Sequence, residues 1–155
     1  MNFLEDFKKE FPNGERKIFS PEDRLKTLQI DQRDQKRIEE LEFGKIDVNN
    51  EEYSNTAFAV ISVSKIAGIN RQDNVKNWIE CLFGLHKQRN FELFPGREKY
   101  EKFLMSGDKD SEDLPHVVEH GGKYYVSENG KHRITFAKCL GIENISVFVS
   151  RKMPP

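Results

Sequence analysis

The chain has 155 residues, which is the length of one domain or of one domain with an extension. Charged residues make up 33% of it, and 25 Lys and Arg balance 26 Asp and Glu, so a uniformly basic nucleic-acid-binding surface is excluded. The 12 Phe, 4 Tyr and 1 Trp exclude a chain that is disordered throughout. The sequence has neither an apolar run of about 18 residues nor the apolar segment of a signal peptide. We therefore expect a soluble, cytoplasmic protein with no membrane partner.

The first predicted element is a long helix over residues 21–43. Ser20 is a typical N-cap, a proline follows at the first helical position, and two acidic residues come next at the positive end of the helix dipole. Gly44 is the expected stop. Because apolar positions are sparse along this helix, we expect it to lie on the surface or to contact another protein chain. Residues 1–50 are predicted to form an N-terminal helical extension, and residues 51–155 the main domain.

The middle of the chain contains one predicted strand and two predicted helices. Residues 45–54 are polar and predict a connection, whereas residues 56–66 alternate and are rich in β-branched side chains, which is typical of a strand. Asp73 or Asn74 is expected to cap the next helix. A short helix is predicted over residues 97–105, and an acidic loop follows it.

The C-terminal part has the clearest pattern. A strand, a tight hairpin turn, a returning strand, a helix and a final strand are predicted over residues 114–119, 120–122, 123–126, 131–140 and 145–149. Gly141 sits where a left-handed C-cap belongs, and Ile142 can make the hydrophobic contact that accompanies such a cap. This order of elements indicates an α+β fold.

The charges are unevenly distributed along the chain. Residues 1–120 carry 19 basic and 24 acidic side chains, whereas residues 121–155 carry six basic and two acidic ones. Lys131 and Arg133, at the start of the predicted C-terminal helix, belong to this basic part. The basic C-terminal quarter keeps DNA among the expected partners.

The turn at residues 128–133 (ENGKHR) is the segment that indicates chemistry. It leads into a helix whose first N–H groups point outward and carry a partial positive charge. Gly130 permits an unusual backbone conformation and the close approach of a ligand. Lys131 and Arg133 add two charges suited to oxyanions, and His132 can donate a further hydrogen bond. Together these residues predict an oxyanion site, with phosphate as the expected anion. The alternative is that the glycine only starts the helix and that the cations are solvated surface residues.

Residues 124–133 (YYVSENGKHR), continued by Ala137, Leu140-Gly141-Ile142 and a closing strand, resemble the ParB/sulfiredoxin superfamily. The hallmark of that family is a strand, an acidic-Gly-x-His/Arg-Arg turn, and a helix with a small residue four positions after the Arg. Residues 61–66 (ISVSKI), followed by Asn70-Arg71-Gln72, are similar to the opening strand and arginine motif of the family. The resemblance covers about residues 57–150 and implies a ParB/sulfiredoxin-like core, a small mixed sheet with packed helices.

The resemblance also implies a pocket for the phosphates of a nucleotide. The phosphates would be held by Gly130, Lys131, His132 and Arg133, and approached from the other half of the chain by Arg71. The implied ligand is a nucleoside triphosphate, CTP or ATP, with Mg²⁺ as its companion ion. The implied functions are nucleotide-dependent hydrolysis or phosphotransfer, or a DNA-associated role.

Glu128 precedes the predicted phosphate turn and is the candidate general base or Mg²⁺ ligand, unless it only balances the neighbouring cations. Sulfiredoxins carry their nucleophilic cysteine where this chain has Lys131, so sulfinic acid reduction is not expected. Members of the family that partition DNA also carry a helix-turn-helix domain, for which this sequence shows no counterpart, so sequence-specific DNA partition is not expected. Cys81 and Cys139 lie far apart and predict neither a disulfide framework nor a metal site. The alternatives for function are a non-catalytic protein- or DNA-interaction module with a vestigial pocket, and a ParB-like nuclease.

Overall fold

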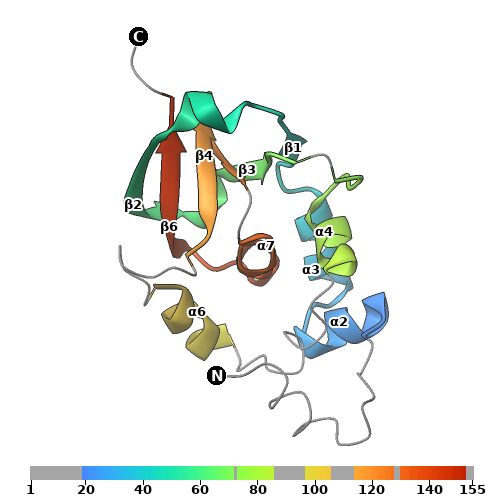
Figure 1. Cartoon of the computed structure of the whole chain (residues 1–155). Helices are drawn as coiled ribbons and strands as arrows, with labels where there is room; N and C mark the ends of the chain where they lie inside the picture. Colours follow the sequence, from blue (N-terminus) through green and yellow to red (C-terminus); the bar gives the residue numbers. More distant parts are fainter. Residues whose placement is uncertain (1–18, 72, 86–96, 106–113, 128–129, 153–155) are drawn as a thin grey trace, which may run out of the picture.

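A computed structural model describes residues 19–71, 73–85, 97–105, 114–127 and 130–152 (Figure 1). The helices are α2 (Pro21–Thr27), α3 (Gln32–Glu39), α4 (Trp78–Gly84), α6 (Arg97–Met105) and α7 (Lys131–Leu140), with the 3₁₀ turns η1 (Asn50–Tyr53) and η2 (Val63–Lys65). The strands are β1 (Gly44–Lys45), β2 (Asn55–Ser62), β3 (Ile66–Ile69), β4 (His116–His120), β5 (Lys123–Val126) and β6 (Asn144–Arg151). This combination of a sheet with packed helices confirms the α+β class.

The six strands form one mixed sheet in the order β1-β3-β5-β4-β6-β2. Strands β1, β3 and β5 run parallel to one another, and β4 runs parallel to β6. The β4–β5 hairpin and the β2–β6 pair are antiparallel. Figure 1 shows β1 and β2 at opposite ends of the sheet, with α7 lying against it between α4 and α6. The buried face of the sheet meets α7 through side chains such as Val117, Val147, Ile134 and Phe136.

The C-terminal elements follow the sequence-based expectation closely. Strand β5 and helix α7 have the predicted bounds, and the predicted strands before and after them are present with shifted ends. Gly141 adopts the left-handed conformation (φ 66°), and its N–H donates to the carbonyl of Lys138. The N–H of Ile142 donates to the carbonyl of Ala137 at 3.0 Å, and the Ile142 side chain is buried. These two bonds form a Schellman motif, which explains why the helix ends here.

The predicted long helix over residues 21–43 is wrong, because the chain forms two short helices there. Gln29 has a φ of 57°, which breaks the helix between two buried residues, Leu28 and Ile30. The side chain of Asp31 then caps α3 by accepting a hydrogen bond from the N–H of Asp34 at 2.8 Å. The break places both apolar side chains in the core, which one continuous helix would have placed on different faces.

Helices α2 and α3 contact α4 and share the core of the sheet domain, since Ile38 is fully buried within it. Arg24 of α2 is also buried, and its guanidinium donates to the carbonyls of Leu82 and Phe83 at the end of α4. The surface position expected for this region therefore holds only for its polar side. The division of the chain at residue 50 stays a prediction.

Two other expectations needed correction in the middle of the chain. The strand predicted over residues 56–66 is divided by η2 into β2 and β3, which lie in different parts of the sheet. The connection predicted over residues 45–54 contains η1 and begins with the end of β1. Helix α4 is capped by Asn77, whose side chain accepts from the N–H of Glu80, and not by Asp73 or Asn74. None of the helices in the described ranges has the length and apolar character needed to cross a membrane.

Candidate functional site

The candidate site lies where three neighbouring parallel strands end. Lys45 at the end of β1 pairs with Ile69 at the end of β3, and Ile69 pairs with Val126 at the end of β5. In parallel sheets the carboxyl ends of the strands share one edge, and ligands bind there when the connecting loops carry suitable groups. The topology of β1, β3 and β5 therefore brings together three segments that are far apart in the sequence.

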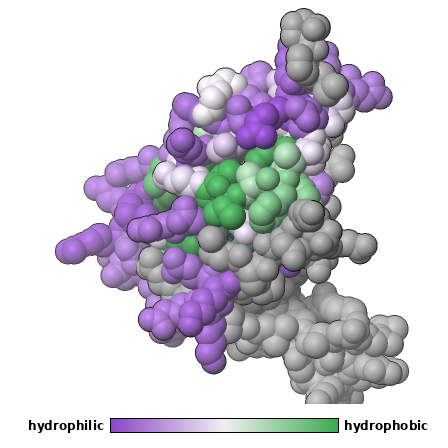
Figure 2. All heavy atoms as spheres, turned by 90° about the vertical axis from the view of Figure 1, so that its left-hand side faces the viewer, coloured by the Kyte–Doolittle hydropathy of each residue, from purple (hydrophilic) through white to green (hydrophobic). Residues whose placement is uncertain are grey.

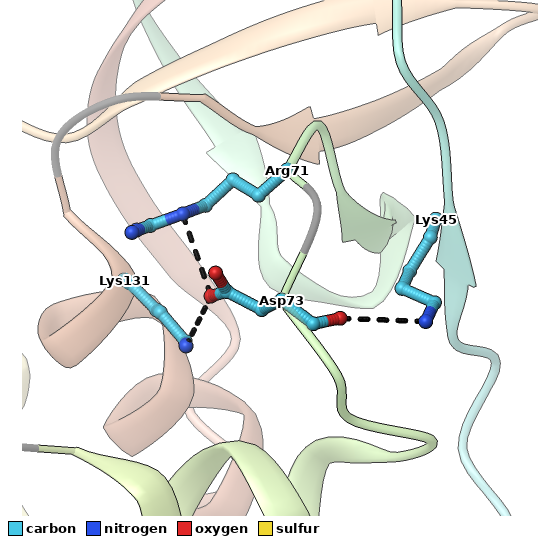
Figure 3. Close-up of polar contacts among 4 residues, drawn as sticks. All are labelled: Lys45, Arg71, Asp73 and Lys131. Carbon is cyan, nitrogen blue, oxygen red and sulfur yellow. Dashed lines mark hydrogen bonds and ion pairs between the residues drawn. The ribbon is translucent and has the colours of Figure 1, made fainter.

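These segments supply one carboxylate and three cations, which we call the Asp73 cluster: Lys45, Arg71, Asp73 and Lys131. The Nζ atom of Lys131 donates to Oδ2 of Asp73 at 2.5 Å, and Nε of Arg71 lies 3.4 Å from the same oxygen. The Nζ atom of Lys45 donates to the main-chain carbonyl of Asp73 at 3.3 Å. Figure 3 shows the Arg71 and Lys131 side chains approaching the carboxylate from two different elements.

The electrostatics of the cluster leave an excess of positive charge. The hydrogen bond from Lys131 lowers the pKa of Asp73, and the charges of Lys131, Arg71 and Lys45 act in the same direction, while partial burial opposes them. Asp73 is therefore ionised at neutral pH and neutralises one of three cations. The Lys131 side chain is only 15% exposed, against 29% for Asp73 and 36% for Arg71, so the charges are screened less than those of an open surface.

The loop that carries Arg71 is held in place by both neighbouring segments. The N–H of Asn70 donates to the carbonyl of Val126 at 2.7 Å, which ties the end of β3 to the end of β5. The side-chain oxygen of Asn70 accepts a hydrogen bond from the N–H of Val48 at 2.9 Å. Asn70 thus positions the loop between β1 and β5, and Arg71 follows directly after it.

Gly130, expected to admit a ligand, has a reason for being glycine within the protein itself. It precedes α7 with a φ of 101°, a conformation that other residues rarely adopt. A Cβ atom at this position would lie 2.2 Å from Cβ of Pro115. The packing against Pro115 therefore accounts for the glycine, and its presence alone does not indicate a ligand.

The remaining predicted site residues are distributed as follows. His132 and Arg133 are half-buried in the first turn of α7, after Lys131. Successive residues of a helix point in directions about 100° apart, so the three side chains leave the helix in different directions, and their joint binding of one ligand stays a prediction. The structure brings Arg71 and Lys131 together, and it places His132 and Arg133 beside them on the same turn. Glu128 lies outside the described residues.

Two residues of the cluster, Lys45 and Asp73, were not predicted as site residues. Local sequence pattern alone places Lys45 in a polar connection and Asp73 at a helix cap, and it does not bring them to the site. A prediction of the parallel pairing of β1 with β3 would have placed Lys45 beside the arginine loop.

Other groups with possible chemistry have structural roles. Burial raises the pKa of the Cys81 thiol to about 11 and that of Cys139 to about 12, so neither is a ready nucleophile. Nδ1 of His120 forms a hydrogen bond of 2.7 Å with the hydroxyl of Tyr53. In the part of the chain that the structure describes, no three His, Cys, Asp or Glu side chains gather as metal ligands would.

Comparisons of the chain with family models, with curated proteins and with solved structures found no match.

Proposed function

We propose that the protein is a ParB/sulfiredoxin-like domain that binds a phosphate-bearing ligand, a nucleoside triphosphate such as CTP or ATP, at the Asp73 cluster and the start of α7. One observation carries the proposal. Arg71 and Lys131 come from different halves of the chain and meet at one carboxylate oxygen. The family resemblance implied, from the sequence, that Lys131 is one of four phosphate-holding residues of the turn and that Arg71 approaches them from the other half of the chain.

The chemistry of the cluster suits a phosphate group. Lys131 offers a compact charge, and Arg71 offers a planar fork of donors that matches two phosphate oxygens. Helix α7 has ten residues, and its N-cap is a glycine, which has no side chain to cap the first turn. The partial positive charge at this helix start adds to the attraction for an anion.

Asp73 is the competitor that a phosphate must replace or share. Its carboxylate occupies the position between Lys131 and Arg71 and satisfies cations that would otherwise be unfavourable at a helix start. In this proposal a phosphate, with more charge and more acceptor oxygens, takes over these cations, and the carboxylate turns toward Lys45 or solvent. Mg²⁺ would arrive bound to the phosphates of the nucleotide. The candidate base Glu128 is outside the described residues, so the proposal is one of binding.

Thermal unfolding with added ligand tests the proposal. Pyrophosphate, CTP, ATP and GTP are compared, each with and without Mg²⁺, for the wild type, Arg71→Met and Lys131→Met. A ligand at 100 times its dissociation constant stabilises the native state by about 2.7 kcal/mol. We expect such a stabilisation for at least one nucleotide in the wild type, and its reduction to about half, as a tenfold weaker affinity gives, in both variants.

Lys26→Met, which removes an exposed cation from α2, is the matched control and should keep the stabilisation. A wild type that no phosphate compound stabilises, or a stabilisation equal in all four proteins, would refute binding at the Asp73 cluster.

A further inference from the structure

Strand β2 forms an open end of the sheet. It is paired over all eight of its residues with β6 on one side, from Asn55 opposite Arg151 to Ser62 opposite Asn144. Within the described residues its other side has no strand partner, because β2 is the last strand in the sheet order. The backbone N–H and C=O groups along this side are available to another strand.

The sequence of β2 lacks the features that usually protect such an edge. Natural edge strands carry charges, proline or bulges, or are very short. Strand β2 reads NTAFAVIS, with no charged residue, no proline and no break in its pairing with β6. Phe58 is 37% exposed and Val60 is 50% exposed, and they are the large hydrophobic residues exposed in the described part of the chain. The green, hydrophobic area in the middle of Figure 2 is the exposed surface of this part of the sheet.

Both exposed side chains lie on the same face of the sheet. Residues alternate between faces along a strand, and Ile61 of β2 is buried in the core beneath the sheet. Phe58 and Val60 therefore point to the opposite face. There the Phe58 ring meets Phe148 of β6 edge-on, with ring centres 6.5 Å apart, and Phe148 contacts His116. An apolar strip thus runs from the open edge onto the neighbouring strands.

We propose that β2 is the dimerisation edge of this protein and pairs antiparallel with β2 of a second copy, so that one sheet continues through two molecules. A two-fold axis perpendicular to the sheet keeps each residue on its own face. With this axis at Ala59, Phe58 lies opposite Val60 of the partner subunit, and the reverse pair forms on the other side of the axis. Aromatic and β-branched side chains in opposite positions stabilise antiparallel strands.

The charges around β2 favour a second copy as the partner. The strand itself is neutral, so two identical strands do not repel each other. The 3₁₀ turns at its two ends carry opposite charges, with exposed Glu51 and Glu52 in η1 and exposed Lys65 in η2. Antiparallel pairing brings η1 of each molecule to η2 of the other, so acidic groups meet a basic one at both ends. With the axis at Ala59, residues 56–62 of the two strands face each other, and these seven residues give a paired length of about 24 Å.

Sedimentation velocity over a range of protein concentrations tests the pairing. We expect the wild type to be a dimer at micromolar concentration, and Val60→Lys, which places a charge on the exposed edge, to weaken dimerisation at least tenfold. Gln32→Lys adds the same charge on α3, at the far side of the molecule from β2 in Figure 1, and should remain dimeric. A wild type that stays monomeric up to about 1 mM, that forms larger assemblies without a discrete dimer, or that dimerises equally well as Val60→Lys would overturn the proposal.

A charge exchange provides a second test that does not alter the strand. Lys65→Glu should weaken the dimer, because it places acidic groups opposite each other, and Glu52→Lys combined with Lys65→Glu should restore it. Hydrogen exchange of the β2 amides should slow as the protein concentration of the wild type rises. Equal dimerisation by the single and double variants, together with exchange that is independent of concentration, would rule out this edge as the contact.

Discussion

Lys131 and Asp73 form an ion pair that joins the first residue of α7 to the loop after β3, with Nζ 2.5 Å from Oδ2. The pair is partly buried, and Arg71 approaches the same oxygen. It therefore contributes both to the folded structure and to the charge of the candidate site. The two contributions can be measured separately, because one acts on the free energy of unfolding and the other on ligand affinity.

For stability, we predict a coupling of about 1 kcal/mol or less between the two side chains in a double-mutant cycle of Lys131→Met and Asp73→Asn. The hydrogen bond from Lys131 lowers the pKa of Asp73 in the folded state. Its stabilisation is therefore complete above the unfolded value of about 3.9 and is lost as the pH falls through the lower folded value. Urea unfolding at pH 7 and at steps below pH 4 should show wild type and Asp73→Asn converging in acid. A constant difference across this range would contradict the assignment.

The buried Arg24 should be one of the most sensitive positions for stability. Its Nε donates to the carbonyl of Phe19, and its Nη1 donates to the carbonyls of Leu82 and Phe83 at 2.6 and 3.0 Å. Arg24→Met removes these charge-assisted bonds at the C-terminal end of α4, and we predict a loss of about 2–3 kcal/mol in the free energy of unfolding. Arg24→Lys should recover little, because one ammonium group cannot reach three carbonyls as the fork does.

Denaturant unfolding measures both Arg24 variants, and Arg33→Met on the exposed side of α3 is the control, with an expected change below about 0.5 kcal/mol. If Arg24→Met were as mild as the control, α2 would not be held by this side chain.

Gly130 and Gly121 allow strain and packing to be separated. Both have positive φ, 101° and 60°, but an added Cβ meets Pro115 at Gly130 and open space at Gly121. We predict that Gly121→Ala costs about 1 kcal/mol, from backbone strain alone, and that Gly130→Ala costs at least twice as much. Thermal or urea unfolding of the two variants measures this difference. Equal losses would show that the contact with Pro115 is easily relieved.

Lys138 has an unusual setting that gives a pH-dependent stability. Its Nζ donates to the carbonyl of Val63 at 3.1 Å and lies 5.4 Å from the centre of the Trp78 ring. Burial lowers the pKa of Lys138 to about 8. The unfolded chain, with a lysine pKa of about 10.4, binds more protons between these values, so this group makes the protein more stable as the pH rises through that window. Below pH 8 the buried charge is a cost to the fold.

The measurement is the difference in free energy of unfolding between wild type and Lys138→Met at pH 7, 8, 9 and 10. The difference is needed because burial raises the pKa of both cysteines, and their titration in the unfolded chain has the opposite effect. We predict that the Met variant is the more stable protein at pH 7 and that the wild type gains on it by up to about 1.4 kcal/mol per pH unit above pH 8. In Lys138→Met the carbonyl of Val63 loses the hydrogen bond from Lys138, but it still accepts one from the N–H of Ile66. A difference independent of pH would mean that Lys138 is solvated.

The elements that the sequence predicted well are those with local signals. The hairpin glycines, the start of α7 at Gly130 and its end at Gly141 each depend on a few neighbouring residues. The break between α2 and α3 was missed because it is set by the core, which buries Leu28 and Ile30 together. No local pattern contains that information.

Strand β1 was missed for a different reason. It has two residues, and its pairing depends on the close approach of two backbones, since a Cβ on Gly68 would come within 1.7 Å of the carbonyl oxygen of Gly44. The residues of the candidate site were likewise predicted only in part. Arg71 and Lys131 were anticipated through the family resemblance. Asp73 lies two residues after Arg71, and Lys45 joins them only through the non-local pairing of parallel strands.

The central claim is that the cations held by Asp73 bind a phosphate group, and the affinity of three proteins tests it most directly. Calorimetric titration of the wild type, Asp73→Asn and Lys131→Met with the nucleotide that stabilises the fold should give three different dissociation constants. We predict about tenfold tighter binding for Asp73→Asn, because the competing carboxylate is lost, and about tenfold weaker binding for Lys131→Met. Identical affinities in the three proteins, or no binding of any phosphate compound, would contradict the account.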